Sequence, residues 1–208
     1  MTDTQYPDNR ITRENSALVL VDHQLGLILG VHDQDQEQLR RNVVSLAGFA
    51  TAYDIPVVIT TSADDGPNGD LLPELSRLLP DATLIRRPGE IDAFDNQDFE
   101  AAIRATGRSH LIIAGISTDV CVTFAALSAI SRGYHAHAVL DASGTWSALA
   151  SQAAAARMQT AGVVLNSTVA VAAELQRDWR NPGGAELAAV FSDSALPFYG
   201  SLVSFATR

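Results

Sequence analysis

Short apolar runs alternate with longer stretches of helical composition along this chain, and this alternation limits the fold more than any other feature. Four runs are rich in β-branched and other apolar residues, and three of them have no polar residue in their interior. They cover residues 16–21, 55–60, 111–116 and 135–140, with weaker candidates at 82–85 and 162–165. Continuous apolar runs are typical of strands that are covered on both faces.

The segments between the runs have the periodicity of amphipathic helices. Within residues 35–53, Leu39, Val43, Leu46 and Ala50 recur at the three- and four-residue spacing of one helix face. Further helices are expected over residues 98–106, 122–131 and 147–160. Strands and helices alternating at these lengths predict βαβ units in a three-layer α/β/α sandwich, with Rossmann-type layering around a mostly parallel central sheet.

The length of 208 residues suits one domain, residues 1–208, with a substantial core. Hydrophobic residues make up 47% of the chain and charged residues 18%, which indicates a globular protein. After Arg180 the composition changes, and residues 181–208 form a tail with several aromatic side chains. This tail either contacts a neighbouring subunit or docks on its own domain, and the sequence leaves both alternatives open.

Charge and hydropathy exclude several classes of partner. The formal net charge of −10 disfavours binding to nucleic acid or to an anionic membrane surface. No apolar stretch approaches the roughly 18 residues that span a bilayer, and residues 1–15 lack the apolar core of a signal peptide. The single cysteine allows no intramolecular disulfide and suits a reducing compartment. We therefore expect a soluble, cytoplasmic protein that acts on a small molecule.

Three chemically useful side chains lie where predicted strands end. Asp22 follows the first strand, Arg87 lies near the candidate strand at 82–85, and Cys121 begins the helix after the third strand. The carboxyl ends of parallel strands meet at one edge of a sheet, where function gathers. A cysteine nucleophile needs a proton acceptor, which Asp22 could supply. Arginine could stabilise the thiolate and limit the basicity of Asp22, and backbone N–H groups at the helix start could bind an oxyanion.

The cysteine and the histidines of the chain also have purely structural interpretations. A lone cysteine is often only a small apolar residue of the core. His23 and His32 have no partner at ligand spacing, so no metal site is predicted. His135 and His137 lie on one face of a strand and are interpreted as a covered or edge-facing pair.

Two stretches carry a resemblance to a known family. Val-Asp-His-Gln at 21–24 and Gly-Ile-Ser-Thr-Asp-Val-Cys-Val at 115–122 resemble the isochorismatase-like cysteine hydrolases. The likeness extends from about residue 15 to residue 180 and is greatest to the YcaC-type subgroup. The subgroup resemblance rests on residues 60–63, 66–69, 87–89, 94–96, 141–145 and 177–181. Each motif is weak by itself, but their order along the chain is specific.

The resemblance implies a triad in which Cys121 attacks a carbonyl or related carbon and Asp22 relays the proton. It also implies a cis peptide bond between Ile116 and Ser117, and an oxyanion hole made by the N–H groups of Ser117 and Cys121. The usual lysine of the family is replaced by Arg87, which limits the third member to an electrostatic role because guanidinium does not release its proton. Family members form rings and octamers, so a homo-oligomer, either a tetramer or an octamer, is expected.

The metal-binding residues of the nicotinamidase branch have no counterparts around residues 60–69, so no metal or other cofactor is expected. Pocket residues are predicted on weaker grounds, and they are Gln24, Thr61, Phe94, Asn96 and Trp146. The sequence thus indicates a metal-independent cysteine hydrolase, an amidohydrolase that cleaves a C–N bond of a small amide-like substrate through a covalent intermediate. The alternatives are a hydrolase of a nitrile, imine or ester, and an oligomeric redox-sensing or binding protein.

Overall fold

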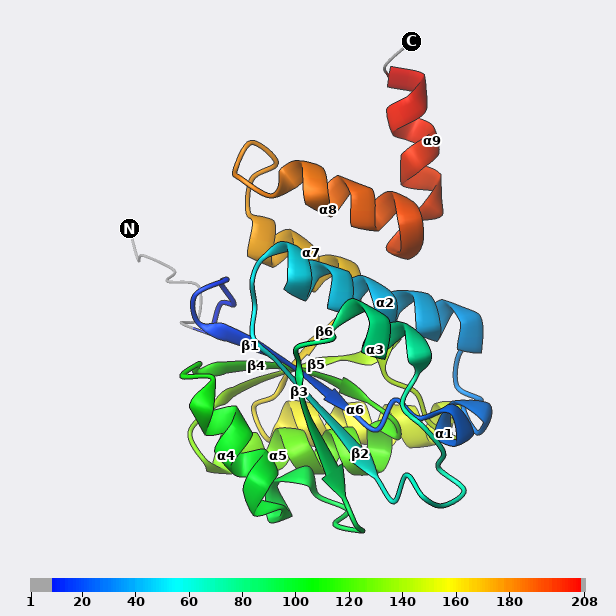
Figure 1. The fold of residues 1–208 in the computed structure, drawn as a ribbon, viewed down its shortest axis with the longest axis vertical. Coiled ribbons are helices and arrows are strands. Elements are labelled where there is room, and N and C mark those ends of the chain that lie inside the picture. The colour runs from blue at the N-terminus through cyan, green and yellow to red at the C-terminus, as the bar shows by residue number, and fades with distance from the viewer. Residues whose placement is uncertain (1–8, 207–208) are drawn as a thin grey trace.

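The computed structural model describes residues 9–206 and contains a six-stranded sheet in which every strand pair is parallel (Figure 1). The strands are β1 (Ser16–Val21), β2 (Val57–Ser62), β3 (Thr83–Arg87), β4 (His110–Gly115), β5 (His135–Val139) and β6 (Val164–Asn166). Their order across the sheet is β3-β2-β1-β4-β5-β6. The chain therefore winds outward from β1 in both directions, and the sheet has its topological switch point between β1 and β4.

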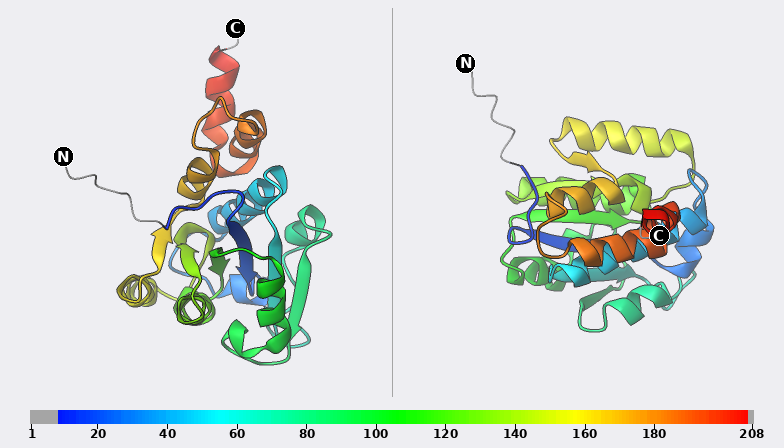
Figure 2. Two further views of the ribbon diagram at one scale, coloured as in Figure 1. Left: turned by 90° about the vertical axis from the view of Figure 1, so that its left-hand side faces the viewer. Right: turned by 90° about the horizontal axis from the view of Figure 1, so that it is seen from above.

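Helices cover both faces of the sheet, which confirms the predicted three-layer sandwich (Figures 1 and 2). One face carries α2 (Gln36–Ala52), α3 (Pro73–Leu78) and α7 (Thr168–Gln176). The other carries α4 (Gln97–Ala105), α5 (Thr123–Ser131) and α6 (Ala148–Thr160). The shorter helices are α1 (Leu25–Leu29), η1 (Ala93–Asp95), η2 (Thr118–Val122) and η3 (Leu140–Ala142).

The central strand shows why the apolar runs are continuous. Every residue of β1 is buried. Leu18 and Leu20 belong to the hydrophobic cluster that includes α2, whereas Val19 and Val21 belong to the cluster on the α5 side. Because successive side chains point to opposite faces, a strand between two helical layers needs an apolar residue at each position.

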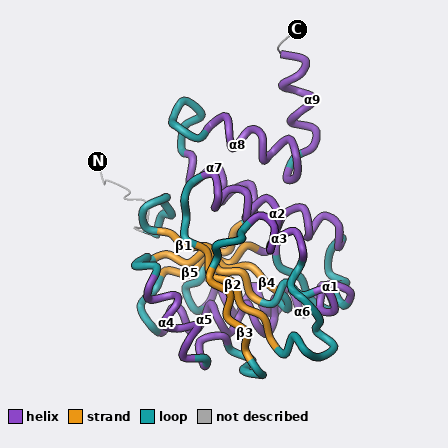
Figure 3. The backbone as a smooth tube through the Cα atoms, viewed as in Figure 1, coloured by secondary structure: helices purple, strands orange, loops and turns teal. Residues whose placement is uncertain are grey.

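The predicted strands and helices are confirmed, with shifts of a few residues at their ends (Figure 3). Helix α2 begins after Asp35, whose carboxylate accepts a hydrogen bond from the N–H of Gln38 at 2.8 Å. The weaker candidate at 82–85 is the edge strand β3, and the one at 162–165 is β6, which begins two residues later. The largest difference lies before α5, where a π-helical turn, η2, holds Cys121.

The tail beyond residue 180 folds into α8 (Gly184–Val190), a π-helical turn η4 (Phe191–Ala195) and α9 (Pro197–Ala206). Phe191 is buried and packs edge-on against Phe49 of α2, with ring centroids 5.6 Å apart. The first part of the tail therefore docks on its own domain. Helix α9 extends away from the sandwich (Figures 1 and 2). Residues 207 and 208 of the predicted tail, like residues 1–8 of the predicted domain, lie outside the described part of the chain.

Within residues 9–206, none of the helices combines the length and the apolar character that crossing a bilayer requires.

Candidate active site

Asp22, Arg87 and Cys121 come together at the carboxyl end of the sheet, as predicted from their places after strands. Asp22 directly follows β1 with a φ of 57°, so the chain turns sharply there. Arg87 is the last residue of the edge strand β3, two strands away from β1. Cys121 lies in η2, which follows β4 on the other side of β1. The three residues therefore reach one point from three strands.

Arg87 and Asp22 form a buried ion pair. Nη2 of Arg87 donates to Oδ1 of Asp22 at 2.5 Å and to Oδ2 at 2.6 Å, and neither side chain is exposed (0% each). The other guanidinium nitrogens are also held, because Nε donates to Oγ1 of Thr60 at 2.9 Å and Nη1 donates to the carbonyl of Glu90. Arg87 is thus fixed in orientation, and it holds the Asp22 carboxylate in place.

Cys121 is half-buried, and its thiol is hydrogen-bonded to Asp22. Burial raises the pKa of Cys121 to about 12, and the adjacent negative charge of Asp22 acts in the same direction. The Ser117 N–H, which donates to the sulfur, and the charge of Arg87 oppose this rise. The raised pKa favours the neutral thiol as the resting form of Cys121. Arg87 acts on the thiol only through its charge, because both of its hydrogen bonds from Nη2 go to Asp22.

Burial also raises the pKa of the Asp22 carboxyl, and the charge of Arg87 and the hydrogen bonds from Arg87 and Cys121 oppose that rise. Arg87 therefore limits the basicity of Asp22, as the sequence suggested. A carboxylate that is desolvated, paired and in contact with a thiol is well placed to accept the thiol proton.

The turn that carries Cys121 has unusual backbone geometry. The peptide bond between Ile116 and Ser117 is cis, as the family resemblance implies. Thr118 N–H donates to the Gly144 carbonyl at 2.9 Å, which ties the turn to the loop after β5. Gly115 permits the close approach of β4 to β1, because a Cβ there would lie 2.2 Å from the carbonyl oxygen of Val21.

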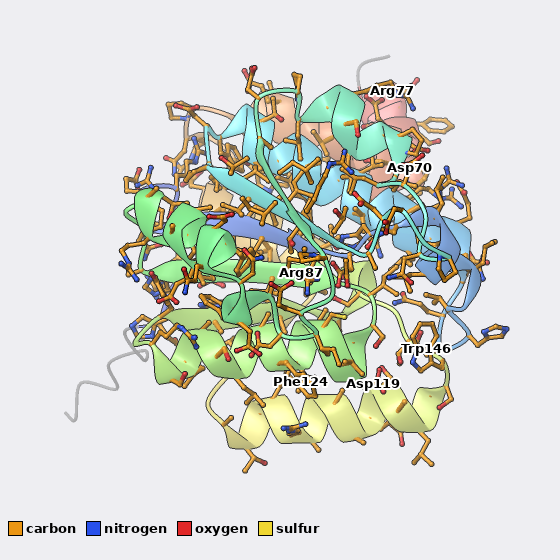
Figure 4. All side chains as sticks on the ribbon, turned by 60° about the horizontal axis from the view of Figure 1, so that its bottom comes forward. Asp70, Arg77, Arg87, Asp119, Phe124 and Trp146 are labelled. Atoms are coloured by element: carbon orange, nitrogen blue, oxygen red, sulfur yellow. The ribbon has the colours of Figure 1, made fainter. Side chains whose placement is uncertain are left out.

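A cavity of about 220 Å³ opens beside Asp22 and Cys121. Its lining consists of Asp22, Leu27, Ser62, Asn68, Ile91, Ile116, Ser117, Val120, Cys121 and Trp146. Figure 4 shows Arg87 over the sheet and Trp146 toward the start of α6. A larger groove of about 620 Å³ lies near residues 50–57 and 77–83, at the amino ends of β2 and β3. That groove is at the opposite edge of the sheet from the cysteine.

Trp146 is the one of the five predicted pocket residues that lines this cavity. Gln24 is fully buried and binds the loop instead, because its Nε2 donates to the carbonyls of Ser62 at 3.1 Å and Gly69 at 2.7 Å. Its Oε1 accepts from the N–H of Ser62 at 2.9 Å. Thr61 is buried as well, and its hydroxyl donates to Asp64 at 3.1 Å.

Phe94 and Asn96 also have structural roles. Phe94 is buried and packs edge-on against Phe99, with centroids 5.1 Å apart. Asn96 caps α4, where its Oδ1 accepts from the N–H groups of Asp98 and Phe99. An aromatic residue of the core and a helix cap look the same in sequence as pocket residues, because both follow a strand end.

The sequence did not single out Leu27, Ile91, Val120 and Asn68 as individual lining residues. Asn68 lies in the turn-rich segment after β2, which composition alone marks as a rim element. The apolar residues carry no comparable signal, because aliphatic side chains are common in core positions.

The histidines do not gather into a metal site. His23 is buried, its Nε2 lies 2.9 Å from the Ala142 carbonyl, and burial lowers its pKa to about 4. The His110 and His135 rings stack at 4.4 Å at the amino ends of β4 and β5, and the ring of His137, in the middle of β5, lies 5.7 Å from that of His110. Among residues 9–206, no three His, Cys, Asp or Glu side chains are grouped so that they could hold a metal ion.

Known proteins share this fold and sequence. An isochorismatase domain model matches residues 16–169. The probable hydrolase YcaC of Escherichia coli K12 is 44% identical over 198 residues, which cover 95% of this chain and 94% of the relative. The chain thus belongs to the isochorismatase family, and it is a hydrolase of that family.

Two solved structures are similar to it over almost their whole length. YcaC from Pseudomonas aeruginosa, solved with hexane-2,5-diol and covalent acrylamide, has a TM-score of 0.94 and 42% identity, over 98% of this chain and 100% of that one. YcaC from Escherichia coli, described as an octameric hydrolase of unknown specificity, has a TM-score of 0.94 and 45% identity, over 97% and 98% of the two chains. The resemblance to the YcaC-type subgroup is therefore confirmed.

Proposed function

We propose that this protein is a cysteine hydrolase that cleaves the C–N bond of a small amide through a thioester on Cys121. One observation carries the proposal. The Cys121 thiol is hydrogen-bonded to a carboxylate, Asp22, that Arg87 fixes in place, and Asp22 and Cys121 both line one cavity. A nucleophile, a positioned proton acceptor and room for a substrate thus lie together.

The reaction divides into acylation and deacylation. In acylation, Sγ of Cys121 attacks the carbonyl carbon while its proton passes to Asp22, and the resulting intermediate expels the amine, which takes that proton from Asp22. In deacylation, a water molecule attacks the thioester carbon while Asp22 accepts a proton, and the sulfur leaves and takes the proton back. The sum is amide plus water to carboxylic acid plus amine, and Asp22 alone carries the proton traffic.

The oxyanion would be bound by the backbone N–H groups of Ser117 and Cys121. The Ser117 N–H already faces the Cys121 sulfur, and both residues line the cavity. Preorganised N–H donors in a buried site typically contribute about 3–4 kcal/mol to transition-state stabilisation. The covalent acrylamide in the Pseudomonas aeruginosa relative supports a reactive side chain in this family that a small amide can reach.

Ammonia release from a panel of small primary amides tests the proposal. We expect turnover by the native protein and its loss in Cys121→Ala and Asp22→Asn. Mass spectrometry of acid-quenched native enzyme should show an acyl adduct on Cys121. Undiminished hydrolysis by Cys121→Ala would overturn the mechanism, whereas cleavage of nitriles, imines or esters in preference to amides would reassign the substrate.

A redox-sensing or binding role is the second alternative from the sequence. Redox-sensor cysteines have a low pKa and are accessible to solvent. Cys121 differs in both respects, because it is half-buried and its pKa is raised to about 12. The structure therefore favours acylation chemistry over oxidation at this residue.

We also propose that the chain acts as a homo-oligomer. The Escherichia coli relative is described as an octameric hydrolase. In this chain α9 extends from the domain with Phe198 59% exposed and Leu202 55% exposed, four residues apart on one helix face. Exposed apolar side chains at this spacing are typical of a helix that packs against another chain. Sedimentation velocity tests this, and a monomer at micromolar concentration would contradict it.

The free thiol of Cys121 suits a reducing compartment, and on that ground we propose that this hydrolase works in the cytoplasm. Fractionation of cells that express the protein tests this assignment, with recovery of the protein in an oxidising compartment as the contrary result.

A further inference from the structure

The wall of the cavity beside Cys121 is almost entirely uncharged. Five of its side chains are apolar, namely Leu27, Ile91, Ile116, Val120 and Trp146. Ser62, Ser117 and Asn68 add polar groups without net charge. Asp22 is the one ionisable carboxylate among the lining residues, and both of its oxygens accept from Arg87. The described lining therefore offers a charged substrate group no free counter-ion.

A charge that enters such a cavity loses its hydration without gaining a partner. Moving an ion from water into an apolar environment costs far more free energy than moving a neutral amide or an alkyl group. Arg87 cannot pair with an incoming carboxylate unless it leaves Asp22, Thr60 or the Glu90 carbonyl. The negative charge of Asp22 is already balanced by Arg87, so an incoming ammonium gains no unpaired counter-ion there. Both signs of charge are therefore disfavoured, for the same reason.

The volume limits size as well as polarity. A cavity of about 220 Å³ is smaller than the roughly 300–1,000 Å³ of most small-molecule pockets. A small amide with a short alkyl chain suits a cavity of this size.

We infer that the substrates of this site are small uncharged amides with a short apolar acyl group, and that amides carrying a carboxylate or an ammonium group are rejected. This inference rests on the proposed amide hydrolysis for its biological meaning. The selectivity of the cavity is nevertheless a property of the cavity wall, so it can be measured without any hydrolysis.

The single cysteine allows this measurement with two reagents of nearly equal shape. Iodoacetamide is neutral and iodoacetate is anionic, and both form an S–C bond to Cys121 with loss of iodide and of the thiol proton. The ratio of their rates is measured for the native protein and again for the same chain unfolded in urea. We expect the rate with iodoacetamide, divided by the rate with iodoacetate, to be at least tenfold higher for the native protein than for the unfolded chain.

Repulsion by the overall charge of −10 would also slow iodoacetate, and ionic strength separates the two effects. The overall field is screened at 0.5 M salt, whereas desolvation inside the cavity is not. A native ratio that persists at high salt supports the inference. A ratio that falls to the unfolded value at high salt, or that equals it throughout, overturns the inference.

A pair of matched variants locates the effect. Ile91 lines the cavity and is 58% exposed, and Leu29 of α1 is 72% exposed and is not part of the lining. Ile91→Lys places a cation at the cavity mouth and should reduce the discrimination against iodoacetate severalfold. Leu29→Lys adds the same charge elsewhere and should leave the ratio unchanged. Equal effects of the two variants would show that the overall charge, not the cavity, discriminates.

Hydrolysis of isosteric amides tests the substrate class. Isovaleramide and malonamate have the same shape but differ by a negative charge, and propionamide and glycinamide differ by a positive charge. We expect the neutral member of each pair to be hydrolysed at least tenfold faster, and kcat/KM to rise about fourfold per methylene until the cavity is full. Equal rates within the pairs would overturn this inference and leave the proposed hydrolase intact. Absence of all amide hydrolysis, with the alkylation ratio as expected, would overturn the proposed function alone.

Discussion

One nitrogen of Arg87, Nη2, donates to both carboxylate oxygens of Asp22, at 2.5 and 2.6 Å, and both side chains are completely buried. The pair connects the edge strand β3 to the central strand β1, with β2 between them. It therefore serves two purposes in the molecule. It fixes the carboxylate of Asp22 beside Cys121, and it holds an edge strand whose own residues are mostly exposed.

Removing one member of this pair should be strongly destabilising. Arg87→Met leaves the Asp22 carboxylate buried without its counter-ion, and such changes typically cost about 3–5 kcal/mol. Urea denaturation measures the loss. Arg86→Met at the neighbouring, mainly exposed position (side chain 61% exposed) should stay within about 0.5 kcal/mol of the wild type. Similar losses for the two variants would contradict the buried role of Arg87.

The raised pKa of the thiol predicts an unusual response to Asp22→Asn. The negative charge of Asp22 is one of the causes that raise the pKa of Cys121 to about 12. Without it, and with Arg87 left unpaired nearby, that pKa should fall. The pH dependence of iodoacetamide alkylation should therefore move to lower pH in Asp22→Asn, while amide hydrolysis is lost. A midpoint that stays in place or moves to higher pH would count against the electrostatic coupling of the two residues.

Two buried histidines predict acid sensitivity of the fold. Burial lowers the pKa of His23 and of His137 to about 4, from the ordinary 6.5. Between about pH 6.5 and 4, these histidines therefore bind protons in the unfolded chain but not in the folded chain. Their stabilising contribution is complete above about pH 6.5, is lost as the pH falls toward 4, and amounts to up to about 3 kcal/mol each.

Measurement of the free energy of unfolding between pH 8 and 4 tests whether stability falls in this direction. His137→Gln should flatten part of the slope between pH 6.5 and 4, whatever its effect on stability at pH 8. An unchanged slope in that variant would show that His137 accepts its proton without loss of structure.

The exposed face of α9 predicts how the assembly could be weakened. Phe198 and Leu202 present apolar surface away from the domain. Phe198→Ser combined with Leu202→Ser should shift the sedimentation coefficient toward smaller species, because association would lose buried apolar area. Unchanged circular dichroism would show that the domain itself is intact. An assembly that resists the double change would place the contact elsewhere.

The sequence predicted the layers and the meeting of Asp22, Arg87 and Cys121 because both depend on strong local signals. Continuous apolar runs identify strands between two helical layers, and the strand ends then place Asp22, Arg87 and Cys121 at one edge. The strand at residues 83–87 was harder to predict, because its side chains are largely exposed and its sequence is not a continuous apolar run. Helices α1, α3 and α7 were missed because they are short or follow their strands closely.

The pocket was harder to predict than the residues at the strand ends. Phe94 and Asn96 have the residue types of a binding site but serve as a core ring and a helix cap. Their roles depend on where α4 begins, which local sequence fixes only to within a few residues. The protonation state of Cys121 was also beyond reach, because it depends on how deeply the thiol is buried and on which group Arg87 binds.

The hydrogen bonds of Gln24 hold part of the cavity wall in place before a ligand binds. Its three hydrogen bonds to Ser62 and Gly69 join the two ends of the loop that contributes Asn68 to the cavity wall. The N–H of Gly26 adds a bond to the Asn68 carbonyl at 2.9 Å. This wall is therefore in place before any ligand arrives, and binding does not have to order it. Little conformational entropy is lost on association, so even molecules of a few heavy atoms can bind with high free energy per atom.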